Sequence, residues 1–192
     1  ERLARLRGQG QAAVAVVVYG NRDYEDALLE LSDRAKDWGL TPVAAGAFIG
    51  EHSYSRPSLP VAEGRPDEDD LKRCRDFAAA VMEKLHRCGS LEQACDFPVK
   101  GSRPYKALKP STPQAPITLP EKCLRCGSCL KHCPTQAIFR AADGSMDTDK
   151  GRCIKCCACV KGCPAQARVF DTPFSEFLHT HFSARREPEF FL

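Results

Sequence analysis

The chain has 192 residues, of which 43% are hydrophobic and 28% charged, and its formal net charge is +3. This length fits two small domains, and the charge is too low and too mixed to indicate binding to nucleic acid. Its 12 cysteines occur without an apolar run of 18 residues and without a signal peptide, so we expect no membrane span, a cytoplasmic location, and thiols that bind metal in place of disulfides.

The first predicted elements alternate between strand and helix. Residues 14–19 (VAVVVY) form a continuous apolar, β-branched run, which is typical of a parallel strand buried on both faces. A helix is predicted from Asp23, which is placed to cap it, to Trp38, with Gly39 as its stop. Residues 42–49 (PVAAGAFI) predict a second buried strand. The order predicts parallel strands with flanking helices, although strand 14–19 has a predicted neighbour on one side only.

A long helix is predicted to begin near Pro66, where the acidic residues 67–70 favour the positive end of the helix dipole. Its predicted apolar stripe consists of Leu71, Cys74, Phe77, Ala78, Val81, Leu85 and Cys88. Cys74 and Cys88 are interpreted as small buried residues of this stripe. Six prolines between Pro98 and Pro120 then predict an extended linker. We therefore predict a first domain at residues 1–97 and a linker at residues 98–116.

Two cysteine motifs with the same spacing follow the linker. Residues 123–134 read CLRCGSCLKHCP and residues 153–164 read CIKCCACVKGCP, so C-x2-C-x2-C-x3-C-P occurs twice. The similarity continues after the prolines as TQAI and AQAR, and Cys157 falls opposite Gly127. The repeat selects eight ligands. It leaves Cys157 as a small buried residue or, alternatively, as a spare thiol for redox sensing or cluster repair.

This spacing predicts iron–sulfur clusters. A C-x2-C-x2-C run wraps around one [4Fe-4S] cluster, and where bacterial proteins carry two runs the fourth cysteine of each binds the other cluster. The predicted ligands are Cys123, Cys126, Cys129 and Cys163 for one cluster, and Cys133, Cys153, Cys156 and Cys159 for the other. Zinc, the alternative, also favours four cysteines but usually takes two pairs separated by a longer spacer. Crossed ligation would join the two halves of a domain with few large aliphatic residues.

On these motifs, residues 117–170 resemble a bacterial-type ferredoxin, a small α+β domain with two [4Fe-4S] clusters that carries single electrons. Residues 167–170 (ARVF) predict a strand. Residues 171–192 are predicted to form a C-terminal amphipathic helix and tail, the helix beginning at Pro173 and carrying Phe174, Phe177, Leu178 and Phe182. We expect this segment to pack against its own protein, and the alternative is that it docks a partner.

The segments VVVYGNRDYEDALLEL, AFIGEHSYS and GRPDEDDLKRCRDF resemble the later part of a flavodoxin-like domain, and the whole chain resembles a family in which such a domain is fused to a ferredoxin. The resemblance implies an FMN-facing loop formed by Tyr19, Gly20, Asn21, Arg22, Asp23 and Tyr24, with Tyr24 stacked on the flavin. The alternative is an ordinary turn before a helix. No Ser/Thr/Gly-rich phosphate loop precedes residue 14, so residues 1–97 resemble an incomplete flavodoxin-like domain. A preceding segment or a second copy of the chain would complete its sheet.

These resemblances imply an electron-transfer protein that carries two [4Fe-4S] clusters and exchanges electrons with redox partner proteins and with an FMN. One alternative is an iron–sulfur/flavin subunit of an oxidoreductase. A second is a flavin-free protein whose first half docks a partner. The sequence contains no His, Ser or carboxylate constellation that calls for catalysis, which favours a carrier over an enzyme.

Overall fold

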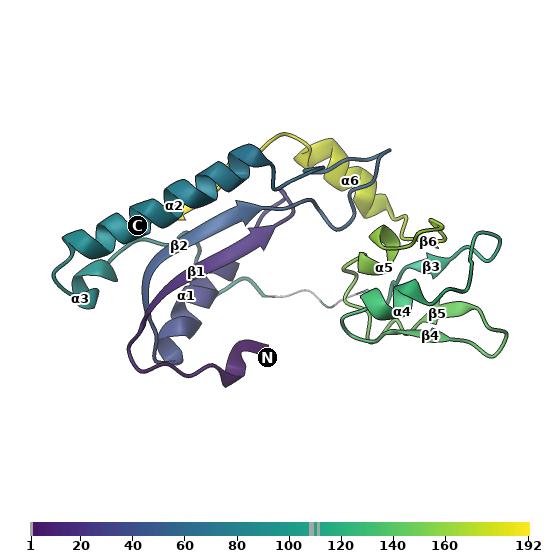
Figure 1. Cartoon of the computed structure of the whole chain (residues 1–192), viewed down its shortest axis with the longest axis horizontal. Helices are drawn as coiled ribbons and strands as arrows, with labels where there is room; N and C mark the ends of the chain where they lie inside the picture. The colour runs from purple at the N-terminus through teal and green to yellow at the C-terminus, as the bar shows by residue number, and fades with distance from the viewer. Residues whose placement is uncertain (1, 108–109, 111) are drawn as a thin grey trace. The chain divides into compact units, whose positions relative to one another are not determined.

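A computed structural model describes residues 2–107, 110 and 112–192. The chain forms two compact units (Figure 1). Unit 1 comprises Glu1–His52, Val61–Leu108 and Phe182–Leu192, and unit 2 comprises Ser53–Pro60 and Lys109–His181. Residues 108, 109 and 111 of the predicted linker lie outside the described residues. Unit 1 is thus assembled from segments on both sides of the two cysteine motifs.

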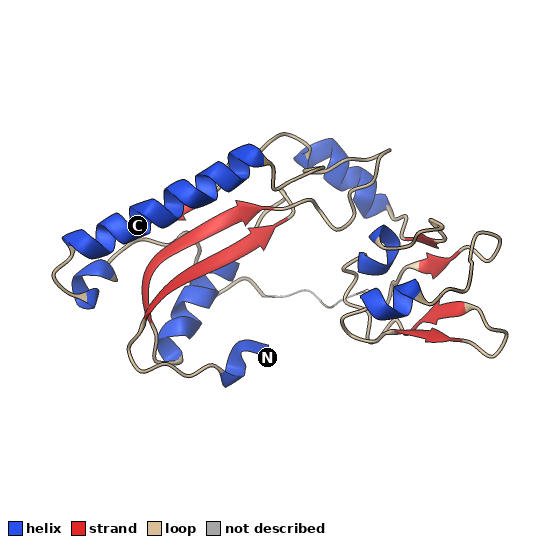
Figure 2. Cartoon of the chain, viewed as in Figure 1, coloured by secondary structure: helices blue, strands red, loops and turns tan. Residues whose placement is uncertain are grey.

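A three-stranded sheet in the order β1-β2-β7 lies at the centre of unit 1. Figure 2 shows β1 and β2 side by side. After a 3-10 turn (Arg2–Arg5), β1 (Ala12–Tyr19) and β2 (Thr41–Ile49) are parallel and connected through α1 (Ala27–Asp37). This order confirms the strand, helix and strand predicted there. β7 (Glu189–Phe191), which was not predicted, pairs antiparallel with β2. β2 is therefore the central strand.

Helices cover both faces of β2. On one face, Leu28 of α1 packs with Ala45 and Ala47, and on the other, Phe77 of α2 (Glu68–Arg87) packs with Ala44. Alternate residues of a strand point to opposite faces, so α1 and α2 lie on opposite sides of the sheet. The predicted second strand is accordingly buried along its length.

β1 has one buried face and one exposed face, so the prediction of a strand buried on both faces is wrong. Ala15 and Tyr19 are buried in the core with α1, whereas Val14, Val16 and Val18 are 42%, 44% and 68% exposed. The cause is the position of α2, which packs over β2 and β7 and leaves the neighbouring face of β1 uncovered. Among the described strands, β1 pairs with β2 alone, and its other edge is open.

The helix boundaries differ from the prediction at one point. α1 begins at Ala27, because the Asp23 carboxylate accepts a hydrogen bond from the Glu25 amide in a turn and does not cap the helix. It ends as predicted before Gly39, whose φ is +79°. α2 begins in the predicted acidic segment, where Asp67 and Asp70 form a reciprocal capping box.

The buried stripe of α2 is rotated from the predicted one. Phe77 and Val81 are buried as expected, but Leu71 is 40% exposed and Ala78 is also exposed. Two polar residues take their place: Asp70 pairs with Arg65, and the Lys84 ammonium donates to the Val43 carbonyl at 2.9 Å. Hydrophobic spacing misplaces the stripe because these two charged residues have buried partners. Cys74 and Cys88 are half-buried against the same core, as predicted. A short helix, α3 (Leu91–Ala94), follows.

Unit 2 contains two small antiparallel sheets and short helices. β3 (Ile117–Thr118) pairs with β6 (Arg168–Val169), and β4 (Ile138–Arg140) pairs with β5 (Met146–Thr148). Two further elements are α4 (Ser128–His132) and α5 (Ala158–Lys161). The strand predicted at residues 167–170 corresponds to β6. The helix predicted from Pro173 is α6 (Pro173–Phe182).

Candidate metal centre

The two cysteine motifs follow the same backbone path. Each forms a loop that leads into a short helix, α4 or α5. Left-handed φ angles occur at matching positions of the repeat: Arg125 (+53°) and Lys155 (+55°), Gly127 (+77°) and Cys157 (+55°), Gln136 (+52°) and Gln166 (+51°). Left-handed residues turn successive amide N–H groups toward the inside of a loop, which creates an anion-binding concavity. The sequence repeat is therefore a structural repeat, and each loop is suited to surround a negatively charged centre.

The four cysteines of one predicted ligand set line a cavity of about 20 Å³, and Cys157 lines it as well. Three of them, Cys153, Cys156 and Cys159, come from the second motif, and Cys133 comes from the first. Within the described part of the chain, no three Cys, His, Asp or Glu side chains lie close enough together to hold a single metal ion. The cavity nevertheless brings thiols of both motifs together.

The other predicted set is brought together in part. Cys123 and Cys129 pack in the same core cluster, together with Ile138. Cys126 lies at the surface, and Cys163 is half-buried in the loop after α5. Cys123, Cys126 and Cys129 lie on a loop with the same backbone path as the loop of Cys153, Cys156 and Cys159.

Backbone amides donate hydrogen bonds to the last cysteine of each motif. The Ala137 amide lies 3.1 Å from Cys133 Sγ, and the Ala167 amide lies 3.3 Å from Cys163 Sγ. Burial would raise the pKa of both thiols, but these amides and other nearby donors outweigh it, so the pKa of each lies below its ordinary value. Thiolate is the form that binds metal. Both cysteines are therefore favourable ligands.

Cys157 differs from the predicted ligands around it. It is 3% exposed, and its thiol donates a weak hydrogen bond to the Lys155 carbonyl. Burial, followed by the neighbouring thiols of Cys159, Cys156 and Cys153, raises the pKa of Cys157 to about 12. A buried thiol with a raised pKa stays protonated, which supports its interpretation as a packing residue that replaces Gly127.

One basic residue of this region was not identified from the sequence. Arg168, in β6, is 2% exposed, and its Nη2 lies 3.9 Å from Cys159 Sγ. The signal that could have found it is the difference between TQAI and AQAR, since the repeat places Arg168 opposite the apolar Ile138.

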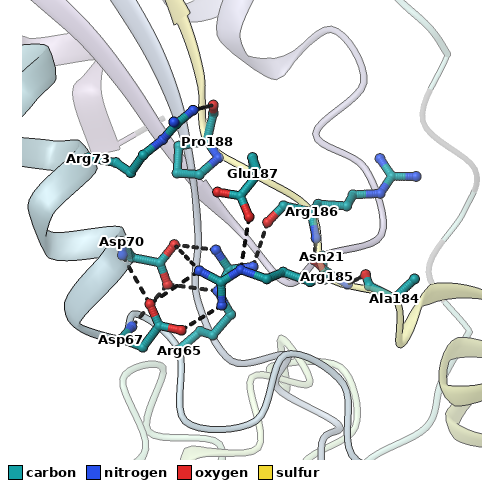
Figure 3. A network of polar contacts seen from close by, with 10 residues as sticks. All are labelled: Asn21, Arg65, Asp67, Asp70, Arg73, Ala184, Arg185, Arg186, Glu187 and Pro188. Atoms are coloured by element: carbon teal, nitrogen blue, oxygen red, sulfur yellow. Dashed lines mark hydrogen bonds and ion pairs between the residues drawn. The ribbon is translucent and has the colours of Figure 1, made fainter.

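The loop predicted to face FMN is covered by the C-terminal tail (residues 182–192) of unit 1. Asn21 is 1% exposed, and its side-chain amide donates to the carbonyls of Phe182 and Ala184 at 2.6 and 2.8 Å. Figure 3 shows the bond to Ala184 beside a second anchor, in which Arg65 pairs with the buried Asp70 and donates to the Arg186 carbonyl at 2.6 Å. The tail therefore occupies the side of the loop to which Asn21 points.

The tyrosines of this loop are also engaged. Tyr24, predicted to stack on the flavin, is 6% exposed, and its hydroxyl donates to Glu189 at 3.0 Å. The Tyr19 ring meets it edge-on at 5.2 Å, and the Lys100 ammonium lies 4.9 Å from the Tyr24 ring centre. Two further loop residues also have close neighbours. Arg22 pairs with Glu25. Gly20 lies so close to His52 that a Cβ at this position would collide with it. Stacking needs an open ring face, so this loop does not fit FMN in this structure.

Comparison with known proteins supports iron–sulfur chemistry in unit 2. No helix among the described residues is both long and apolar enough to cross a membrane. A search of curated proteins finds no match to the chain. A family model described as a 4Fe-4S dicluster domain matches residues 115–164, which contain both cysteine motifs. This part of the chain is a small ferredoxin-type 4Fe-4S domain.

Proposed function

We propose that the protein is an electron carrier that holds two [4Fe-4S] clusters in unit 2 and passes single electrons between redox partner proteins. The observation that carries the proposal is the cavity lined by Cys133 together with Cys153, Cys156 and Cys159. This cavity combines thiols of both motifs, as crossed ligation requires. The match of residues 115–164 to a 4Fe-4S family supports the same chemistry.

The repeat supports two clusters over one. Each motif has its own run of three cysteines, its own left-handed residues and its own amide bond to the last cysteine. We assign the first cluster to Cys123, Cys126, Cys129 and Cys163, and the second to Cys133, Cys153, Cys156 and Cys159.

The surrounding residues prepare the site for electron transfer. When bound, a [4Fe-4S] cluster supplies one-electron redox chemistry at a potential set by net charge, hydrogen bonds to sulfur and solvent exposure. Amides donate to Cys133 and Cys163, and Cys129 and Cys159 are 7% and 8% exposed. Ile154 lines the cavity and is also 58% exposed. Its side chain therefore separates the second site from solvent, and we propose that a partner approaches there.

Iron content and paired substitutions test the proposal. The protein purified without oxygen should be brown, bleach on reduction and contain about eight irons per chain. Cys163→Ser should remove one cluster. Adding Cys126→Ser should then cause no further loss of iron, because both residues serve the first cluster, whereas adding Cys156→Ser should remove the second cluster as well.

Iron analysis and electron paramagnetic resonance (EPR) of the two double variants distinguish crossed from local ligation. Local ligation gives the reverse result, with iron retained when Cys156→Ser is the second change. Colourless protein with stoichiometric zinc would refute the iron–sulfur assignment itself. The matched single variant, Cys133→Ser, should leave the EPR signal that Cys163→Ser removes.

Unit 1 is proposed to be part of a flavodoxin-like layer that serves a partner and not a flavin. Parallel β1 and β2, the α1 connection and α2 on the opposite face support this assignment. The alternative, an iron–sulfur/flavin subunit of an oxidoreductase, needs FMN at the loop where Asn21 and Tyr24 contact the tail. One flavin per chain in the purified protein would favour that alternative. A cytoplasmic location is proposed because none of the 12 cysteines forms a disulfide. A reducing compartment keeps thiols in this state.

A further inference from the structure

Arg168 is held in a fixed position inside unit 2. Its Nη1 donates to the Thr118 hydroxyl at 2.7 Å, and its Nη2 donates to the Pro116 carbonyl at 2.9 Å and to the Thr148 hydroxyl. These partners belong to two separate segments: residues 116–118, which include β3, and β5. With 2% of its surface exposed, the guanidinium is fixed by packing and hydrogen bonds together.

The charge of Arg168 is not balanced by an acidic residue. Its hydrogen-bond partners are two hydroxyls and a carbonyl, its Nε is buried without a partner, and none of the ion pairs among the described residues includes it. An arginine stays charged in a protein. Burial of a charge is strongly unfavourable unless an opposite charge lies near it. The structure therefore requires a negative partner close to this guanidinium.

The available negative partners are the cysteine ligands. Arg168 Nη2 lies 3.9 Å from Cys159 Sγ, a ligand proposed for the second cluster. This contact places the guanidinium beside the second proposed set.

The repeat indicates that the fold does not need an arginine at this position. Ile138 occupies the matching position after the first motif, is 6% exposed and packs in the core of unit 2. An apolar side chain therefore fills the equivalent position in the first half of the repeat. The arginine in the second half calls for an explanation other than packing.

We propose that Arg168 is a positioning residue that raises the reduction potential of the second cluster through its buried charge. The inference rests on the proposed two-cluster function. Reduction adds one negative charge to a cluster, and a fixed positive charge in a medium of low dielectric constant stabilises the reduced form more than the oxidised form. The two threonine hydroxyls and the Pro116 carbonyl keep the guanidinium beside the ligands in both states.

Redox titration of substituted holoprotein tests this role. Arg168→Ile copies the residue of the first half, so it is the variant most compatible with the fold, and Arg168→Gln is a second neutral variant. In both, the EPR-monitored midpoint of the second cluster should move to more negative potential. We expect the equilibrium constant for one-electron reduction to fall about tenfold or more, which corresponds to about 59 mV. Arg168→Lys, which keeps the charge, should stay close to the unchanged protein.

Arg152→Gln is the matched control, because Arg152 is exposed and donates to the Thr135 carbonyl near Cys133. Solvent screens an exposed charge, so the midpoints of Arg152→Gln should stay near those of the unchanged protein.

Unchanged midpoints in Arg168→Ile and Arg168→Gln with full iron content would overturn the role of Arg168. Loss of iron from all three Arg168 variants would also overturn it, because a structural role would then suffice. Absence of iron from the unchanged protein would instead refute the proposed function.

Discussion

Cys157 occupies a backbone position that favours glycine. Its φ is +55°, and the matching residue of the first motif is Gly127, with φ of +77°. A side chain in this left-handed conformation costs roughly 1–2 kcal/mol. Cys157 compensates through burial of its thiol, which is 3% exposed. We therefore propose that the fifth cysteine of the second motif is a packing residue and not a ligand.

Replacement of Cys157 by glycine should leave the iron content unchanged. Relief of backbone strain, roughly 1–2 kcal/mol, offsets the loss of a small buried side chain, about 1 kcal/mol. The free energy of unfolding should therefore change by no more than about 1 kcal/mol. Iron analysis and denaturant unfolding measure both quantities. Cys156→Gly is the control and should lose iron; an equal loss in Cys157→Gly would make Cys157 a ligand.

The predictability of single residues depends on what restricts them. Cys133 and Cys163 could be proposed as ligands from the sequence, because cluster ligation requires a fixed spacing. Arg168 could not, because a lone arginine in a short strand is most often a surface residue. Only its partners, Thr118, Thr148 and Pro116, which are distant in sequence, show that it is buried.

At the scale of elements, the first part of the predicted linker is attached to α1. The amides of Ser102 and Lys106 donate to Asp26 at 2.8 and 2.7 Å. Arg103 and Tyr105 both bond Asp33, the tyrosine at 2.6 Å. Proline content predicted the lack of helix and strand, but it carries no information on which acceptors the loop would reach.

This attachment should weaken in acid. The Arg103 guanidinium is the main cause that holds the pKa of Asp33 below its ordinary value. A carboxylate with a lowered pKa in the folded state contributes stability above the unfolded pKa, about 4, and loses it as pH falls through the folded pKa. Hydrogen-exchange protection of residues 102–106 should therefore be constant from pH 7 to about 4 and then decrease.

The control for this pH dependence is Asp33→Asn. An amide cannot titrate, so residues 102–106 should be less protected at pH 7 and should show a smaller decrease below about pH 4, which comes from Asp26. A decrease of the same size in Asp33→Asn would assign the effect to other carboxylates.

Two strands show the limits of pattern analysis at this scale. β7 (Glu189–Phe191) is too short to show a two-residue period, and its pairing with β2 joins residues far apart in the chain. β1 was recognised as a strand from its β-branched residues, but its exposed valine face depends on where α2 lies. Composition predicted β1 and β2 as strands, whereas tertiary packing decided which of their faces are covered.

At the scale of the whole molecule, the open edge of β1 predicts self-association. Val14, Val16 and Val18 are exposed beside a strand edge without a partner among the described residues. Such an edge pairs readily with another chain, and a lysine on it opposes that pairing. Val18→Lys should therefore reduce the concentration-dependent association of the protein in sedimentation experiments, with circular dichroism unchanged.

Met82→Lys provides the comparison for this variant, since Met82 is 53% exposed on α2 and lies outside β1. It should associate as the unchanged protein does. Equal association of all three proteins would exclude the β1 edge as the contact.

The third strand of unit 1 also determines the order of events during synthesis. Residues 189–191 are translated after both cysteine motifs, and until they leave the ribosome the edge of β2 that pairs with β7 is bare. Tyr24 and Asn21 also lack their hydrogen-bond partners until the C-terminal tail (residues 182–192) has been translated. The loops of residues 123–164, which carry both cysteine motifs and belong to unit 2, are translated earlier. We therefore expect that these loops can receive iron before β7 pairs with β2.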